Sequence, residues 1–343
     1  MKNNLLYLNL AIDEKDTSLG FTIDWIKEIS KNFKSVDVVT LRLNSMPSLE
    51  KNIKIYGKKQ QSGKFTKYIY LYKTVNKLLK SKKYDRRFSH MSPISLLVVS
   101  ILLKKYNIPS SMWFTHPGPT RGYKKYILYL AYKLSEWVLT ASMSSFPYRS
   151  KKVITIGHSI NLDLFRYERK ELKIENFLIL SRISRSKNIE FAIESFLKSS
   201  NKNNKLDIIG GTLNKEDENY LKELKRKYAK NKNINFLGKV LHKELNTILP
   251  KYDVNFNCSG PGFFDKSILE TLANGIVNFY NNNDFDVFYG EESKNYRFSN
   301  QNSLVKNLNN LKIDSIEKVI HNAEIELENH SLSTLNDRLE KYI

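Results

Sequence analysis

A basic loop between an apolar run and an amphipathic stretch carries the first residues suited to chemistry. The apolar run ends at Leu180, and Arg182 and Lys187 follow it, five residues apart, before a helical pattern begins near residue 189. The exposed N–H groups and the dipole of a helix amino terminus, together with two cations, favour a bound anion such as a diphosphate. The alternative is that both cations are solvated charges of the kind that commonly precede helices.

A second candidate segment, residues 258–275, joins a Gly-rich loop to a helix. Gly260 and Gly262 allow a backbone to approach a ligand closely. Asp265 is placed to cap the helix that follows. Glu270 lies inside that helix, where its carboxylate either accepts hydroxyl protons from a sugar or faces water.

Three histidines end or follow apolar runs in the first half of the chain. His116 either contacts a substrate at a strand end or is a satisfied core histidine. His158 is either a hinge residue or a wall of the site. His90 either lines the acceptor side of the site or simply packs.

Two rounds of alternating patterns position these residues. Short apolar, β-branched runs alternate with longer amphipathic stretches, which is typical of βα units and a parallel sheet. In the first half we expect strands at 5–10, 36–41, 53–56, 88–91, 112–115, 138–141 and 153–156, and helices at 21–32, 67–80, 94–106 and 123–135. In the second half we expect strands at 176–180, 206–209, 234–237, 254–257 and 276–280, and helices at 189–199, 216–230, 241–249 and 267–273.

The length of 343 residues suits two domains of roughly 150 residues each. We therefore expect an α/β fold with two Rossmann-like, doubly wound parallel-sheet domains that face each other across a cleft. The expected divisions are an acceptor-side or membrane-facing domain over 1–166, a nucleotide-sugar domain over 167–325, and a C-terminal helix over 326–343 that packs back on the first domain. Ligands of such folds bind at the carboxyl ends of the strands.

Four ordered segments of the second half resemble the retaining glycosyltransferases of family four, which have the GT-B architecture. That family has Gly-Arg-hydrophobic at a strand end and a Lys five residues after the Arg; here Ser181 replaces the Gly, and Arg182 and Lys187 match. Residues 208–211 are similar to the family's hydrophobic-Gly strand end, and residues 236–240 to its Phe-hydrophobic-Gly-x-Val motif. Residues 259–275 are similar to its Ser-x-x-Glu-x7-Glu-Ala-x-Ala-x-Gly signature. In the first half, residues 16–21, 114–117 and 156–161 agree with the family in spacing more than in identity.

The resemblance implies a hexosyltransferase that takes a nucleotide-diphosphate sugar, retains the anomeric configuration and needs no metal or other cofactor. Arg182 and Lys187 would hold the diphosphate, Glu270 the ribose hydroxyls, and His116 would contact the transferred sugar. Residues that would complete the donor site are Gly20, Gly210, Gly238, Val240, Phe264, Lys266 and Ser267, with Gly238 and Val240 beside the base. The acceptor would be a glycan or a lipid-linked molecule, as in bacterial-type surface polysaccharide or glycolipid synthesis.

One departure from the family pattern concerns the sugar end of the site. The first Glu of the Glu-x7-Glu pair falls at position 262, where this chain has Gly262. We expect either that Asp265 takes over near the sugar, with His116 and Glu270 as the other catalytic candidates, or that Asp265 is only a helix cap. The chain would then be a catalytically impaired nucleotide-sugar-binding protein of the same fold. A GT-B epimerase or phosphorylase fits the second-half motifs less well.

The positive charge of the chain is concentrated in the first half. Residues 1–168 hold 29 Lys+Arg against 11 Asp+Glu, whereas residues 169–343 hold 27 against 24, so that +18 of the net +21 lies in the first half. We expect a helix over 67–80 whose buried stripe is formed by Ile69, Tyr72, Val75 and Leu79, and whose outer face carries Lys73, Lys77 and Lys80. This outer face either docks on anionic lipid or is an ordinary solvated face. Compositional bias is a further explanation of the charge.

The same charge suggests a rival class, a basic nucleic-acid-binding protein. We expect no nucleic-acid partner, because no helix-turn-helix, zinc or RNA-recognition signature accompanies the charge. The single cysteine, Cys258, leaves no internal disulfide and suits a reducing cytoplasm. We expect no signal peptide and no membrane-spanning segment, hence a cytoplasmic protein that is either free or peripheral on the inner face of the membrane.

Overall fold

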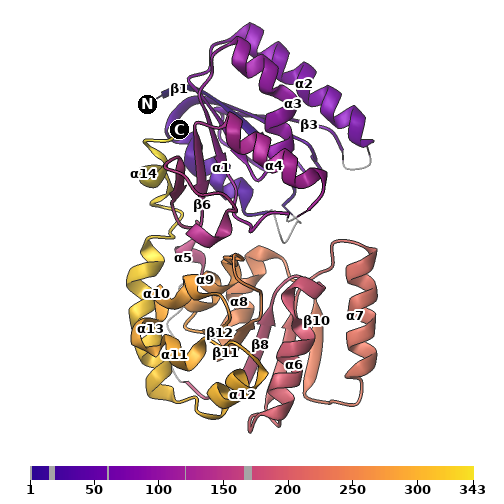
Figure 1. Ribbon diagram of the computed structural model, residues 1–343, viewed down its shortest axis with the longest axis vertical. Coiled ribbons are helices and arrows are strands. Elements are labelled where there is room, and N and C mark those ends of the chain that lie inside the picture. The colour runs from indigo at the N-terminus through magenta and orange to yellow at the C-terminus, as the bar shows by residue number, and fades with distance from the viewer. Residues whose placement is uncertain (1, 15–19, 60–61, 120, 166–171) are drawn as a thin grey trace. The chain divides into compact units, whose positions relative to one another are not determined.

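The computed structural model describes residues 2–14, 20–59, 62–119, 121–165 and 172–343 (Figure 1). The chain forms two compact units. The first unit comprises Met1–Ser159 with Leu332–Ile343, and the second comprises Ile160–Ser331.

The first unit is built on a parallel sheet of seven strands in the order β3-β2-β1-β4-β5-β6-β7. The order reverses at β1, so the sheet is doubly wound. Its strands are β1 (Lys2–Asn9), β2 (Phe33–Thr40), β3 (Ile53–Gly57), β4 (Arg86–His90), β5 (Ser110–Trp113), β6 (Trp137–Thr140) and β7 (Val153–Thr155).

Helices cover both faces of this sheet (Figure 1). The helices are α1 (Thr22–Ser30), α2 (Lys64–Ser81), α3 (Pro93–Lys105), α4 (Tyr123–Leu134) and α14 (Leu335–Leu339), with a 3₁₀ turn at Met143–Ser145. Neighbouring pairs α2–α3 and α3–α4 pack together, and α1 packs with α14. The side chain of Asn336 in α14 donates a hydrogen bond of 2.7 Å to the Glu28 carbonyl of α1, which ties the C-terminal segment to this unit.

The apolar stripe of α2 differs from the expected one. Val75 and Leu79 are buried as expected, but Ile69 and Tyr72 are exposed, and Leu71 and Leu78 take their places in the core. The expected register was wrong by part of a turn, because α2 begins at Lys64 and directs Leu71, Val75 and Leu78 onto a cluster that includes Leu6 and Val39 of the sheet. An apolar and aromatic stripe of α2 is therefore left on the surface.

The second unit is built on a parallel sheet of five strands in the order β10-β9-β8-β11-β12. Its strands are β8 (Asn176–Leu180), β9 (Lys205–Ile209), β10 (Ile234–Gly238), β11 (Val254–Asn257) and β12 (Val277–Tyr280). The chain order reverses between β8 and β11, so the crevice at that switch lies between the loops that follow these two strands.

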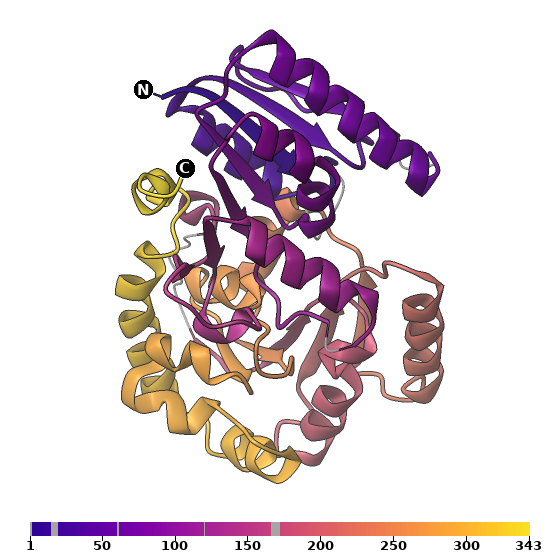
Figure 2. The same cartoon turned by 45° about the horizontal axis from the view of Figure 1, so that its top comes forward.

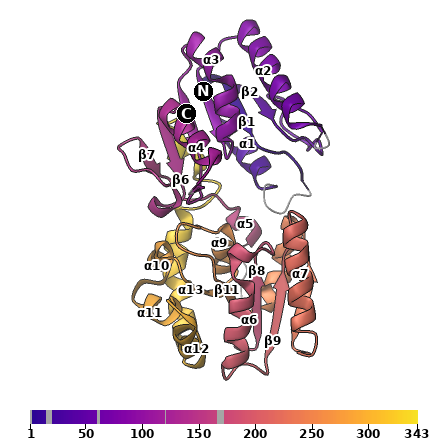
Figure 3. The same cartoon turned by 45° about the vertical axis from the view of Figure 1, so that its right-hand side comes forward.

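Helices of the second unit also lie on both faces of its sheet (Figure 3). They are α5 (Leu162–Phe165), α6 (Ile189–Lys198), α7 (Lys215–Lys227), α8 (Leu245–Ile248), α9 (Lys266–Ala273), α10 (Asp286–Tyr289), α11 (Ser293–Tyr296), α12 (Gln301–Asn309) and α13 (Ile313–Glu328). The 3₁₀ turns lie at Arg185–Lys187, His242–Glu244, Leu249–Lys251, Asn283–Phe285 and Gly290–Glu292. The yellow α13 packs along the orange α10 (Figure 2).

Most expected elements are present within a few residues of their expected bounds, and the expected class of two doubly wound parallel sheets is confirmed. The helix expected over 241–249 was wrong: it is interrupted, with α8 between two 3₁₀ turns. Pro250 lies in the second turn, and a proline lacks the N–H that a continuing helix needs.

The units divide before Ile160, ahead of the boundary expected after residue 166. Ile160 pairs with Ser331 in an isolated bridge, and Phe165 packs in an apolar cluster with Leu178 and Leu249 of the second unit. The segment expected as one helix over 326–343 is split: residues 326–331 end the second unit, and 332–343 belong to the first. Among the described residues, no helix has the length and hydropathy needed to cross a bilayer.

Candidate functional site

The ends of the neighbouring strands β8 and β9 position the loop that carries Arg182. The Ser181 amide donates to the Ile209 carbonyl at 3.1 Å, and the Ile183 amide donates to the Gly211 carbonyl at 2.9 Å. The backbone hydrogen bonding between the neighbouring chain segments therefore continues past the end of β8, and it fixes the backbone on both sides of Arg182. The Arg182 side chain is half-buried, and its Nε is buried without a hydrogen-bond partner among the described residues. A cation held in this way is suited to bind an anionic group from a ligand.

Gly210 is required for the close approach of the loops after β8 and β9. A Cβ at this position would lie 1.7 Å from the Ser181 carbonyl oxygen, a distance that no side chain can occupy. At Gly211 the nearest atom to such a Cβ is 3.5 Å away, on the flexible side chain of Lys239. Gly210 thus belongs to the site through its backbone, because it sets the position of Ser181 and Arg182.

We predict that Gly210→Ala displaces the loop at Ser181 and destabilises the second unit by about 1 to 3 kcal/mol, the usual penalty of forcing atoms into a filled space. Hydrogen exchange of peptides covering 176–184 should accelerate in this variant. Gly211→Ala is the matched control and should exchange as the unaltered chain does. Equal exchange in both variants would contradict the prediction.

Lys187 and Asp265 form a half-buried ion pair between the loops after β8 and β11. Lys187 Nζ lies 2.6 and 2.8 Å from the two carboxylate oxygens of Asp265, and their side chains are 11% and 18% exposed. Asp265 also accepts hydrogen bonds from Asn257 Nδ2 at 3.0 Å and Ser259 Oγ at 2.5 Å. Burial by itself raises the pKa of Asp265, but Lys187 and these donors outweigh it and hold the pKa below its usual value. The carboxylate is therefore ionised at neutral pH.

The structure tests one of the two roles considered for Asp265, that of a helix cap. Asp265 occupies the N-cap position of α9, but its side chain makes no capping hydrogen bond. Its carboxylate is directed instead to Lys187, Asn257 and Ser259. Asp265 is thus part of the cationic site, and the helix-cap interpretation was wrong.

Gly262 lies in a loop whose path accounts for the missing carboxylate. Its φ is +85°, in the left-handed region that glycine adopts readily and other residues adopt at a cost. A glutamate at this position would adopt this backbone conformation only at a cost in free energy. Asp265 is the acidic side chain that this loop does present.

Glu270 projects from α9 into a cluster with two basic side chains. Its Oε1 lies 2.7 Å from His242 Nε2 and 2.6 Å from Lys266 Nζ. Glu270 is 3% exposed, and burial by itself raises its pKa. Lys266 and His242 outweigh the burial and lower the pKa to about 2, so the carboxylate is charged at neutral pH. The exposed-face alternative for Glu270 was therefore wrong.

The remaining second-unit candidates occupy varied positions. Gly238 ends β10 with a φ of +82°, and Val240 packs against the cluster around Phe165. Phe264 is buried and stacks on Phe285 with ring centroids 4.5 Å apart, so it supports the loop from within the core. Ser267 lies half-buried in the first turn of α9.

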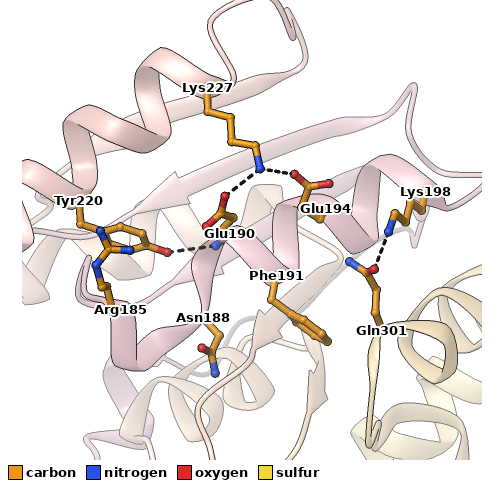
Figure 4. A pocket seen from close by; sticks show the side chains of 9 residues that line it. All are labelled: Arg185, Asn188, Glu190, Phe191, Glu194, Lys198, Tyr220, Lys227 and Gln301. Atoms are coloured by element: carbon orange, nitrogen blue, oxygen red, sulfur yellow. Dashed lines mark hydrogen bonds and ion pairs between the residues drawn. The ribbon is translucent and has the colours of Figure 1, made fainter.

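A separate pocket of about 540 Å³ lies along the outer face of α6 (Figure 4). Lys227 donates there to Glu190 and Glu194, and the guanidinium of Arg185 lies 4.8 Å from the centre of the Tyr220 ring. Arg182 and Lys187 do not line this pocket. Arg185 is thus engaged on the flank of α6, which makes it a control for the cations of the candidate site.

The first-unit candidates end the strands of the other sheet. His116 follows β5 and is exposed, so the alternative of a satisfied core histidine was wrong. Its Nδ1 accepts a hydrogen bond of 3.1 Å from the Gly118 amide. Gly20 accepts a bond from the Ile23 amide at the start of α1, while residues 15–19 of the loop before it lie outside the described residues.

His90 lies within an aromatic cluster of the first unit and does not line an accessible surface. It is fully buried, with Trp25 at 4.9 Å and Tyr7 at 6.2 Å between ring centroids. Neither ring nitrogen has a hydrogen-bond partner among the described residues. His158 is also buried, and its Nδ1 accepts from the Ser159 amide. The expectation that His90 contacts an acceptor was wrong, because aromatic rings of α1 and of the sheet enclose it.

We predict that the first unit loses stability in mild acid because of His90. Burial lowers the pKa of His90 from 6.5 to about 3, so the unfolded chain binds a proton below pH 6.5 while the folded unit does not. The free energy of unfolding should fall by about 2 kcal/mol between pH 7 and pH 5 from this group alone. His90→Phe should remove that part of the pH dependence, whereas the same change at exposed His321 should not. Tryptophan fluorescence reports this unit because Trp25, Trp113 and Trp137 all lie in it.

Sequence inspection missed His242 and Asn257 as members of the site. His242 follows Val240 by two residues and lies in the loop after β10, at the same sheet edge as the expected residues. Its position just beyond a recognised motif was the only available signal. Asn257 ends β11, and nothing in the sequence separates it from other strand asparagines.

The fold and site define an α/β protein with a cationic half-site at the carboxyl edge of its second sheet. Residues 163–284 match the sequence profile of the family described as Glycosyl transferases group 1. The matched residues all lie in the second unit. No curated protein matches the sequence.

Solved structures share the fold over the whole chain. A sucrose-phosphate synthase from Thermosynechococcus elongatus superposes with a TM-score of 0.77 at 13% identity, covering 98% of each chain. HepE from Anabaena, in complex with UDP-glucose, gives a TM-score of 0.75 at 13% identity, again over 98% of each chain. A glycosyltransferase from Rickettsia africae gives 0.73 at 15% identity, covering 99% of this chain and 98% of that one. The chain thus has the two-sheet GT-B fold of these proteins.

Proposed function

We propose that the protein transfers a hexose from a nucleotide-diphosphate sugar to a glycan or lipid-linked acceptor, with retention and without a metal ion, as family-four enzymes do. One observation carries the proposal: Arg182 is half-buried without an acidic partner among the described residues, in the loop that also supplies Lys187. This loop lies within the residues that match the glycosyltransferase group 1 profile. A departing diphosphate is the anion that such a loop would stabilise.

Each part of the donor, namely the diphosphate, the base, the ribose and the sugar, has its own proposed residues. Arg182 and Lys187 bind the diphosphate, and the backbone at Gly238 and the side chain of Val240 border the base. Glu270, which is charged at neutral pH, accepts the ribose hydroxyl protons. His116 contacts the transferred sugar, as the resemblance implies.

The reaction breaks the bond between the anomeric carbon and the diphosphate oxygen, and forms a bond from that carbon to the acceptor oxygen on the same face. The acceptor hydroxyl gives its proton to the leaving diphosphate. Negative charge grows on the diphosphate as the bond breaks, and two cations placed at that oxygen stabilise the transition state more than the bound donor. Two fixed cations can meet this need, which supports a metal-independent reaction.

A thermal-shift screen with UDP, GDP, ADP and their common sugars tests the donor class, because a ligand that binds the folded chain stabilises it by mass action. UDP-sugars come first, since HepE structures contain UDP and UDP-glucose. The preferred donor is then incubated with acceptors in the presence of EDTA, and the anomer of the product is determined by NMR. A chain stabilised by no nucleotide would contradict the proposal.

A second candidate, a nucleotide-sugar-binding protein without turnover, is favoured by Gly262 alone. The departure from the family pattern affects the sugar end and leaves the diphosphate end intact. Tight donor binding with neither hydrolysis nor transfer to any acceptor would support this alternative.

We further propose that the first unit docks on an anionic membrane surface, where a lipid-linked acceptor would be found. The stripe of α2 left on the surface includes Phe65, 84% exposed, and Ile69, with Lys73 and Lys77 beside it. Helix α4 has no acidic residue, and it exposes Tyr123, Tyr126, Leu130 and Leu134. Apolar side chains flanked by lysines are typical of helices that lie at a lipid interface.

Co-sedimentation with vesicles tests the docking surface. Wild-type protein should bind vesicles that contain phosphatidylglycerol and should not bind phosphatidylcholine alone. Replacing Tyr126, Leu130 and Leu134 by Ser should weaken that binding, whereas Ile325→Ser, at an exposed position of the second unit, should leave it unchanged. Binding that is independent of anionic lipid would end this part of the proposal.

A further inference from the structure

Two basic side chains of the second unit meet at one oxygen of Glu270. His242 Nε2 and Lys266 Nζ lie 2.7 and 2.6 Å from Glu270 Oε1, and 2.8 Å from each other. The other carboxylate oxygen, Oε2, receives no hydrogen bond from the described residues. The carboxylate is therefore anchored at one oxygen, and the second oxygen remains available as an acceptor.

The protons of this cluster restrict what His242 can do. The ammonium of Lys266 offers only protons, whereas the carboxylate of Glu270 offers only lone pairs. Nε2 of His242 can form a hydrogen bond with only one of them at a time. When it is protonated it donates to Glu270, and when it is unprotonated it accepts from Lys266. The first arrangement gives Oε1 two donors and holds the carboxylate plane in place, since the imidazole is itself held against the Phe165 ring at 5.3 Å.

The burial of the cluster increases the importance of this anchor. Glu270 is nearly inaccessible, and the side chains of His242 and Lys266 are only 19% and 14% exposed. In such surroundings a missing donor is poorly replaced by water. Without His242, Lys266 is the one remaining donor to Oε1 among the described residues, so the carboxylate is free to rotate and Oε2 is no longer held in one orientation for a ligand.

We infer that His242 is a positioning residue that makes Glu270 selective for a ribonucleoside diphosphate over its 2′,3′-dideoxy counterpart. This inference rests on the proposed function, in which Glu270 receives the ribose hydroxyls. By holding Oε1, His242 and Lys266 leave Oε2 to accept from a 2′ or 3′ hydroxyl. A site built in this way discriminates because an absent hydroxyl leaves a buried charged acceptor without its partner.

Paired titrations of UDP and 2′,3′-dideoxy-UDP, with the guanosine and adenosine pairs run in parallel, test the inference. The wild-type chain should bind the ribose form of its preferred diphosphate at least about tenfold more tightly than the dideoxy form. His242→Leu should reduce that ratio to near one while leaving the affinity for the dideoxy form unchanged. His242→Gln, which keeps an N–H donor of similar reach, should restore much of the ratio, and exposed Lys243→Ala is the matched control.

The outcomes separate the two proposals. A ratio that stays at the wild-type value in His242→Leu would overturn the role of His242 and leave the proposed function standing. A drop in affinity for both forms by the same factor would show a structural role only and would also overturn it. Failure of all three diphosphates to bind the wild-type chain would instead contradict the proposed function.

Discussion

Replacing Lys187 by Met is expected to lower kcat/KM for sugar transfer by about 100- to 1,000-fold, the range seen when one fixed donor to a developing negative charge is removed. The loss should fall mainly on kcat, because the charge of the diphosphate grows as the glycosidic bond breaks. Steady-state kinetics with the preferred nucleotide sugar measure both parameters. Arg185→Met is the matched control: this cation lies two residues away but pairs with Glu223 of α7, so its loss should leave transfer nearly unchanged.

The Lys187 variant requires a second variant beside it, because it leaves the carboxylate of Asp265 in a half-buried site without its cation. Breaking such a pair by removing one partner destabilises a protein strongly, by roughly 3 to 5 kcal/mol for a fully buried pair and less here, where both side chains are partly exposed. The double variant Lys187→Met, Asp265→Asn removes both charges and should recover stability without recovering transfer. Recovery of transfer in the double variant would contradict the assigned role of Lys187.

Asp265→Asn is expected to change binding and turnover in opposite directions. In the ligand-free chain the ammonium of Lys187 is neutralised by Asp265, so a diphosphate must compete with that carboxylate. The Asn variant should bind UDP, or the diphosphate selected by the screen, about tenfold more tightly, as expected for the loss of one competing charge. Transfer and donor hydrolysis should fall by roughly 10- to 100-fold, because the diphosphate product leaves more slowly and because, in the role proposed for Asp265, the variant no longer supplies a carboxylate near the sugar.

The opposite changes in diphosphate affinity and in turnover distinguish the proposed role of Asp265 from a purely structural one. A variant that merely unfolds would lose affinity and turnover together, and thermal melting of the ligand-free chain would reveal it. Titration calorimetry for the diphosphate and initial rates for hydrolysis and transfer are sufficient. Unchanged kinetics would remove Asp265 from the sugar end of the site, whatever its effect on Lys187.

The sequence predicted the fold well because both sheets consist of local units. Apolar runs such as 176–180 and 254–257 are short, β-branched or aromatic, and bounded by polar turns, so their period and length alone identify strands. The errors fell where packing decides between similar patterns. In α2 the sequence offers apolar residues on nearly every side, and only the fit against Leu6 and Val39 selects Leu71 and Leu78 for burial.

The candidate site was predicted in part, through motif order and spacing. Arg182, Lys187 and Glu270 do lie at one sheet edge, since the loops after parallel strands meet there. His90 was misplaced because a histidine at a strand end looks the same whether the ring turns toward solvent or toward Trp25. His242 was missed because no motif marks it and its partner, Glu270, lies 28 residues further along the chain.

Three features can be read from the order of the residues: the succession of βα units, the concentration of positive charge in the first half, and the cations and carboxylates that follow the strands of the second sheet. These are properties of residue type and near spacing, which the chain carries before it folds. The contacts between distant loops appear only in the folded chain. Lys187 is held by Asp265, 78 residues further along, and Glu270 by His242, 28 residues before it, because the sheet brings their loops together. Arg182 forms no ion pair with the described residues, so its charge is not neutralised by them.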